Sequence, residues 1–157
     1  MSAESVSQSR LVVVGVDGSA ESKAAVAYAL RNAAARGDSV RAVTAVPEPE
    51  MWATGYGVVM LPPVDELLPE ARKTAQGVVD AVVAELGEAA SGVSVTVDAL
   101  AGTPAQVLLD AAAEATELVV GHRGRGGVRS ALLGSVGLSC VLHAPCPVTV
   151  VRAAKPA

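Results

Sequence analysis

The 157-residue sequence has no phenylalanine, and aromatic residues make up only 2% of it. Its apolar residues reach 51% and are dominated by alanine, valine and leucine, while charged residues amount to 18%. These proportions argue against a disordered chain, because enough apolar surface is present to form a core. Small and β-branched apolar residues suit parallel strands covered by helices. A chain of this length is expected to form one domain, residues 1–157.

Long uninterrupted apolar runs are also missing. The mean hydropathy is +0.44, yet charge, proline or glycine interrupts each apolar run before it reaches the length that spans a bilayer. Residues 1–10 are polar and lack the apolar segment of a signal peptide. We therefore expect a cytoplasmic protein that does not cross a membrane.

Cysteine is scarce, and acidic residues are absent from the last quarter of the chain. Cys140 and Cys146 do not have the spacing of metal ligands, so we expect both to be reduced and predict no metal site built by the protein. No aspartate or glutamate follows Glu117, whereas five arginine or lysine residues do. The net charge of −4 argues against a nucleic-acid partner. The segment after Glu117, which contains basic but no acidic residues, would nevertheless attract a small anion.

Strand and helix patterns alternate along the chain. The third expected strand alternates apolar and polar residues, which is typical of a strand at a sheet edge. The proline-rich segment 47–69 is interpreted as an irregular excursion and not as a domain boundary. Apolar patterns predict strands at 11–16, 39–46, 93–100, 117–121 and 145–151, and helices at 20–35, 70–90, 104–115 and 130–143.

This order of elements predicts an α/β domain. The expected architecture is a single open, mostly parallel five-stranded sheet with helices on both faces and a core from about residue 10 to 152. In such sheets, ligands bind at the carboxyl ends of the strands, where the direction of the crossovers reverses. The first and fourth strands are expected to flank that reversal, so Asp17 and Gly121 would face each other there. Asp17 could contact ribose, adenine or a magnesium ion, or it could cap the helix that follows.

Two glycine clusters follow the fourth strand. Gly121 and Gly124 are separated from Gly134, Ser135 and Val136 by nine residues, and helical sequence follows the second cluster. Glycine lets backbone N–H groups approach phosphate oxygens, and the N-terminus of a helix adds orphan N–H donors with partial positive charge. The Ser135 hydroxyl would add a further donor. The pattern predicts a phosphate site, although an ordinary glycine turn remains an alternative for the first cluster.

The remaining polar residues of this loop point to binding and not to catalysis. Arg123 and Arg125 could neutralise phosphate charge or remain solvated. Neither a G-x-G-x-x-G after the first strand nor a G-x-x-x-x-G-K-[ST] motif is present, so dinucleotide-binding and P-loop readings are excluded. His122 and His143 have no acidic neighbour that would make a catalytic pair, so we predict no catalytic residue.

The loop spacing resembles the signature of the ATP-binding universal stress proteins, G-x(2)-G-x(9)-G-[ST]. The sequence Val-Asp-Gly-Ser at 16–19 and nearly the whole length fit the same family. His122 departs from it, because many relatives carry a small hydroxyl residue there. The resemblance implies that Ala45, at the end of the second strand, holds the adenine and that the arginines lie along the triphosphate. The implied nucleotide-binding residues are Gly15, Val16, Asp17, Ala45, Gly121, Arg123, Gly124, Arg125, Gly134, Ser135 and Val136.

Three functions are consistent with the sequence. The first is a regulatory or stress-response protein that binds ATP, with or without Mg²⁺, and turns it over slowly or not at all, because no carboxylate follows Glu117. The second is a slow ATPase or nucleotidyl-transfer enzyme with Asp17 as metal ligand, and the third is a partner-binding module without nucleotide. We also expect a homodimer through residues 147–151, an edge strand without an internal charge. Dimers through the last strand are common in the family that this sequence resembles.

Overall fold

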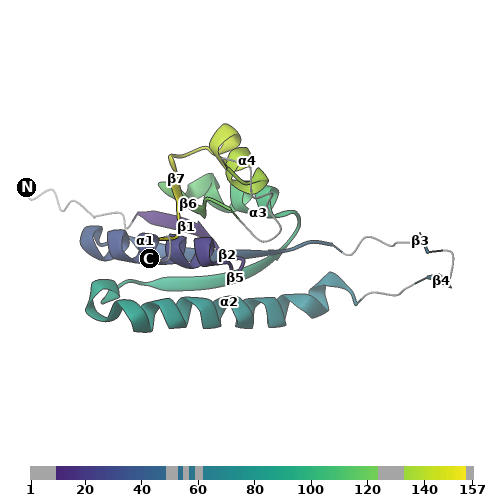
Figure 1. The fold of residues 1–157 in the computed structure, drawn as a ribbon, viewed down its shortest axis with the longest axis horizontal. Coiled ribbons are helices and arrows are strands. Elements are labelled where there is room, and N and C mark those ends of the chain that lie inside the picture. The colour runs from purple at the N-terminus through teal and green to yellow at the C-terminus, as the bar shows by residue number, and fades with distance from the viewer. Residues whose placement is uncertain (1–9, 49–52, 55–56, 59–61, 124–132, 155–157) are drawn as a thin grey trace, which may run out of the picture.

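The computed structural model describes residues 10–48, 53–54, 57–58, 62–123 and 133–154. Its main sheet has five parallel strands in the order β5-β2-β1-β6-β7 (Figure 1). The predicted parallel sheet is thus confirmed, and the third predicted strand, β5, does lie at an edge. The strands are β1 Leu11–Gly15, β2 Ser39–Val46, β5 Val95–Ala101, β6 Glu117–Gly121 and β7 Val148–Val151.

Helices cover both faces of this sheet, as predicted. The helices α1 (Ala20–Arg36) and α2 (Val64–Leu86) lie on one face, and α3 (Pro104–Ala111) and α4 (Ser135–His143) lie on the other (Figure 1). Two separate clusters of buried apolar residues result, one under each pair of helices. Short 3-10 turns, Gly87–Ala90 and Ala112–Glu114, follow α2 and α3. No helix in the described part of the chain is long and apolar enough to cross a membrane.

The central strand β1 shows why its sequence is a continuous apolar run. Val12, Val13 and Val14 are all at most 2% exposed. Because successive side chains of a strand point to opposite faces, Val12 and Val14 join the cluster under α1 and α2, whereas Val13 joins the cluster under α3 and α4. A parallel strand that is buried on both faces needs an apolar residue at every position.

The predicted irregular excursion at 47–69 is wrong at its C-terminal end, and two short strands lie within it. The helix α2 begins at Val64 and contains Pro69, and a two-stranded antiparallel ribbon, β3 (Ala53–Thr54) with β4 (Gly57–Val58), lies apart from the main sheet (Figure 1). Acidic residues in the first turn of α2 favour a helix start there. Pro69 is the sixth residue of α2, so the N–H that would bond to the Asp65 carbonyl is missing, and the helix forms despite that loss.

Two other predicted helices differ in extent. The helix expected over 104–115 ends at Ala111 and tightens into the 3-10 turn that follows it. The helix expected over 130–143 begins only at Ser135, because Gly134 has extended backbone angles and serves as its N-cap residue. Residues 130–132 of that prediction lie outside the described ranges.

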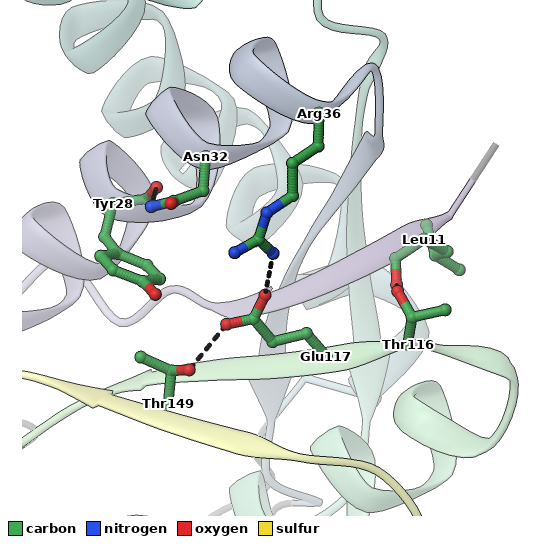
Figure 2. Close-up of polar contacts among 7 residues, drawn as sticks. All are labelled: Leu11, Tyr28, Asn32, Arg36, Thr116, Glu117 and Thr149. Atoms are coloured by element: carbon green, nitrogen blue, oxygen red, sulfur yellow. Dashed lines mark hydrogen bonds and ion pairs between the residues drawn. The ribbon is translucent and has the colours of Figure 1, made fainter.

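A polar network joins α1 to the last two strands. The Glu117 carboxylate accepts a hydrogen bond from Thr149 Oγ1 at 2.6 Å and lies 3.4 Å from a guanidinium nitrogen of Arg36 (Figure 2). Beside it, Thr116 donates both its backbone N–H and its hydroxyl to the Leu11 carbonyl. These contacts hold β6 between β1 and β7 and fix the end of α1 over them.

Candidate functional site

A pocket of about 300 Å³ lies where β1, β2 and β6 end. The strand β1 pairs with β2 on one side and with β6 on the other, so the crossovers leave the sheet in opposite directions at this point, as predicted. Gly124 and Arg125, two of the predicted site residues, lie outside the described residues. The other predicted residues all line the pocket: Gly15, Val16, Asp17, Ala45, Gly121, Arg123, Gly134, Ser135 and Val136.

The turn between β1 and α1 is built by short polar side chains. Ser19 is the N-cap residue of α1, and its hydroxyl accepts a hydrogen bond from the Ser22 backbone N–H at 3.1 Å. Asp17 Oδ1 accepts from the Ser19 backbone N–H at 2.9 Å, while Gly18 between them has a φ of +78°. Ser19, and not Asp17, therefore caps the helix. Asp17 braces the turn and lines the pocket.

Gly121 lies where the end of β6 packs closely against the first turn of α1. A Cβ atom on Gly121 would lie 2.8 Å from the backbone carbonyl carbon of Glu21, in the first turn of α1. The Glu21 carboxylate also accepts a hydrogen bond from the Ala153 backbone N–H at 2.5 Å, just after β7. The glycine thus has a packing role that the sequence pattern alone did not reveal.

The N-terminus of α4 forms another wall of the pocket. Gly134 donates its N–H to the His122 carbonyl at 3.0 Å, which anchors the helix start to the end of β6. No side chain in the described ranges caps α4. Its first N–H groups, beginning at Ser135, are orphan donors at the positive end of the helix dipole, an arrangement suited to an anion.

Two buried polar atoms beside α4 lack partners. Within the described ranges, neither His122 Nε2 nor Arg123 Nε has a hydrogen-bond partner. His122 is only 8% exposed, so it is buried and not solvated, and its backbone N–H donates to the Val151 carbonyl at 2.7 Å. Arg123 lines the pocket itself. A buried guanidinium nitrogen without an acceptor fits an anion in this pocket.

Several lining residues were missed by sequence reasoning. Pro104 and Leu108 lie on one side of the first two turns of α3 and, with Val43 and Ala45 of β2, form an apolar wall. Their helical spacing of four, directly after an expected strand, was a signal that could have found them. Ser22 was also missed, although it lies three residues after the N-cap position. The remaining missed residues are Thr44, Val120 and Gly137.

The sequence from residue 9 to residue 152 matches the model of the Universal stress protein family. The chain belongs to this family. A universal stress protein of Mycobacterium tuberculosis is 35% identical over 158 aligned residues, which cover 92% of this chain and 50% of that protein. The chain spans about half the length of the curated relatives it matches.

Solved universal stress proteins share the fold. One from Lactobacillus plantarum is 27% identical, with a TM-score of 0.71, and the match covers 91% of this chain and 97% of that one. Another, solved in complex with cAMP, is 25% identical with a TM-score of 0.63 over 93% and 98% of the two chains. The architecture of this universal stress protein is therefore that of the family.

Carboxylates and thiols contribute little to the pocket. Asp17 is the one acidic residue among its described lining residues, and no three acidic, histidine or cysteine residues in the described ranges form a metal-binding group. Burial raises the pKa of the Cys140 thiol. Burial, and then the negative charge of Glu117, raise the pKa of the half-buried Cys146. Both thiols thus stay protonated near neutral pH and are poor nucleophiles.

Proposed function

We propose that this universal stress protein is a cytoplasmic regulatory protein that binds an adenine nucleotide, ATP in particular, and turns it over slowly or not at all. The observation that carries the proposal is the division of the pocket into an apolar end and a cationic end. The universal stress protein solved with cAMP supports the same ligand class.

The apolar end suits the adenine base. Val43 and Ala45 come from β2, and Pro104 and Leu108 come from α3, so apolar surfaces are available for a planar ring. Asp17 lies on the β1 side, where its carboxylate could accept hydrogen bonds from ribose hydroxyls or from the adenine amino group.

The cationic end suits the phosphates. Arg123 supplies a guanidinium whose Nε is buried, and the uncapped start of α4 supplies backbone N–H donors at Ser135 and Val136. Gly124 and Arg125, which lie outside the described ranges, belong to the same predicted phosphate loop. Any Mg²⁺ would be held mainly by the phosphates of the nucleotide, because Asp17 is the one carboxylate among the described lining residues.

Slow turnover follows from the shortage of acid and base groups. Phosphoryl transfer needs a residue that orients or deprotonates the attacking water, and a firmly held metal. The sequence contains no aspartate or glutamate after Glu117, so the phosphate loop carries no carboxylate. This favours ATP as a bound effector over ATP as a substrate.

Mass analysis of the small molecules released from the purified protein tests the proposal directly. We expect intact ATP or another adenine nucleotide, and titration calorimetry should then show binding of ATP to the emptied protein. Multiple-turnover phosphate release with Mg²⁺ would favour the enzyme alternative. If no nucleotide is released and ATP does not bind in the titration, the proposal is wrong, and the third alternative, a partner-binding module without nucleotide, is favoured.

We also propose a homodimer in which the β7 strands of two copies pair. Leu118 and His122 donate their N–H groups to the carbonyl oxygens of Pro147, which precedes β7, and of Val151, so these odd-numbered residues turn their carbonyls toward β6. Because this direction alternates along a parallel strand, Val148 and Val150 turn their N–H and C=O groups to the outer edge. No described strand pairs with that edge. A second copy would satisfy these groups across a two-fold axis.

Val150→Pro is expected to weaken such a dimer at least tenfold, equivalent to about 1.4 kcal/mol. Proline removes the outward N–H and leaves the bonds to β6 in place, since proline is tolerated on an edge strand when its N–H would face outward. Sedimentation equilibrium of the wild type and variant measures the effect. Val150→Thr, which keeps the N–H and the β-branched shape, is the control. A monomeric wild type at micromolar concentration, or equal dimer affinity in all three proteins, would refute pairing through β7.

A further inference from the structure

The main sheet has two outer edges, which differ in how their backbone groups are used. The strand β5 forms one edge and β7 forms the other, and no strand in the described ranges pairs with the outer side of either. An open edge offers unpaired N–H and C=O groups to a strand of another molecule, so proteins usually protect it. A chain that could pair at both edges would grow into an open-ended assembly. A discrete assembly therefore needs protection at one edge or more.

The outward groups of β5 follow from its bonds to β2. Ser94, just before β5, accepts a hydrogen bond from the Val40 N–H, and Gly102, just after it, donates to the Val46 carbonyl. These even-numbered residues thus face β2. Because the direction of the backbone groups alternates along a strand, Val97 and the other odd-numbered residues of β5 turn their N–H and C=O groups to the outer edge.

One of these outward carbonyls is already occupied by a side chain. Arg72 Nε donates a hydrogen bond to the Val97 carbonyl oxygen at 2.9 Å. Val97 is the third residue of the seven-residue strand, so the bond interrupts the row of outward groups where a partner strand would need them. Arg72 forms no ion pair with any residue in the described ranges. The edge therefore carries both a hydrogen-bonded side chain and its positive charge.

The sequence of α2 explains how this side chain reaches the edge. The helix packs along β5 (Figure 1), and its buried residues are Ala75, Val79 and Val82. Arg72 precedes Ala75 by about one helical turn and so begins the same stripe. An arginine at this position can lay its methylene groups along apolar surface while its guanidinium reaches the backbone at the rim. The stripe that holds α2 on the sheet thus also places a donor at the β5 edge.

The edge formed by β7 has no comparable protection in the described part of the chain. Its outward groups belong to Val148 and Val150, and no described side chain bonds to them. The side-chain bonds next to these residues involve the Thr149 hydroxyl and the Ala153 N–H. Of the two edges, β5 is therefore the protected one.

We propose that Arg72 closes the β5 edge to strand pairing, so that a second copy of this chain can pair only at β7. A partner strand would have to displace the guanidinium before donating to the Val97 carbonyl. Pairing of two β5 edges about a two-fold axis near Val97 would also bring two Arg72 charges together. With one edge closed, strand pairing can give a dimer but not a filament. The role of Arg72 at β5 does not depend on whether β7 pairs.

Sedimentation velocity of the full chain with Arg72→Met tests the proposal. Methionine keeps a flexible apolar stem but removes the donor and the charge. We expect association through β5 to strengthen about tenfold or more. If the wild type is a dimer, the variant should form larger species; if it is a monomer, the variant should dimerise. Lys73→Met, which removes the same charge from the next exposed residue of α2, is the matched control and should associate as the wild type does.

Amide hydrogen exchange locates the new contact. The outward N–H groups of Val97 and Ala99 should exchange faster in the wild type than in Arg72→Met, and their protection in the variant should grow with protein concentration. Association of Arg72→Met no stronger than that of the wild type would overturn the proposal, as would concentration-dependent protection of these amides in the wild type. A lower melting temperature without added association would reduce Arg72 to a structural link between α2 and β5 and would overturn it as well.

Discussion

Arg123→Ala should weaken ATP binding about thirtyfold, equivalent to about 2 kcal/mol, and leave the domain folded. The Arg123 side chain lines the pocket, and its buried Nε has no acceptor within the described ranges. In the complex, a phosphate oxygen would accept from it, and a hydrogen bond to a charged group contributes more than a neutral one. In the ligand-free protein the same change removes a half-buried side chain whose buried Nε has no hydrogen-bond partner in the described ranges. Its stability should therefore stay close to that of the wild type.

Calorimetric titration with ATP and with AMP checks this expectation. If Arg123 contacts the outer phosphates, the loss for ATP should exceed the loss for AMP. Arg152→Ala is the control, because Arg152 is exposed and lies outside the lining of the pocket, yet its loss changes the net charge equally. Equal loss of ATP affinity in both variants would mean that Arg123 acts only through long-range electrostatic attraction of the nucleotide. Unchanged ATP affinity in Arg123→Ala would show that Arg123 does not contact the phosphates.

Gly121→Ala should lower the free energy of unfolding by about 3 kcal/mol, the upper part of the range for an overpacked interior. The added Cβ would lie 2.8 Å from the carbonyl carbon and 3.0 Å from the carbonyl oxygen of Glu21. These are backbone atoms of α1, so they cannot move away by changing a rotamer. The helix must shift as a body, which also displaces the turn that carries Asp17.

Urea unfolding of the variant measures the loss, and Gly15→Ala is the matched control. Gly15 also ends a central strand, but its Cβ would meet the Leu108 side chain at 3.0 Å, and a leucine terminus can rotate. We expect Gly15→Ala to change the free energy of unfolding by less than about 1 kcal/mol. If Gly121→Ala lowers the free energy of unfolding no more than Gly15→Ala does, Gly121 is not required for the packing of α1.

Elements with one dominant local signal could be predicted from the sequence. The strands β1 and β6 are apolar at nearly every position because both faces are buried. The helix α1 ends at Arg36, one residue beyond its predicted bound, with Gly37 at a φ of +73° as its C-cap. The start of α2 could not be predicted. Its prolines suggest irregular chain, but the helix accepts Pro69 in its second turn.

The pocket was predictable where residues occupy strand ends and not where they depend on packing. Asp17, Ala45 and Gly121 follow from the rule that ligands bind at the carboxyl ends of parallel strands. Leu108 and Ser22 reach the pocket through the placement of α3 and α1 over the sheet, which their spacing in the sequence suggests but does not specify. Whether the residues of the pocket bind ATP stays a prediction, and Gly124 and Arg125 lie outside the described residues.

The pairing of β1 with β6 has a consequence for the order of folding. It brings together residues about a hundred positions apart, such as Val12 and Glu117. The pairs β1–β2 and β2–β5 close shorter loops and need no residue beyond Ala101. Because closing a longer loop costs more entropy and slows folding, we expect β6 to join a preformed half of the sheet. A chain emerging from the ribosome would then complete the pocket at the ends of β1, β2 and β6 only after the residues of β6 and α4 have been synthesised.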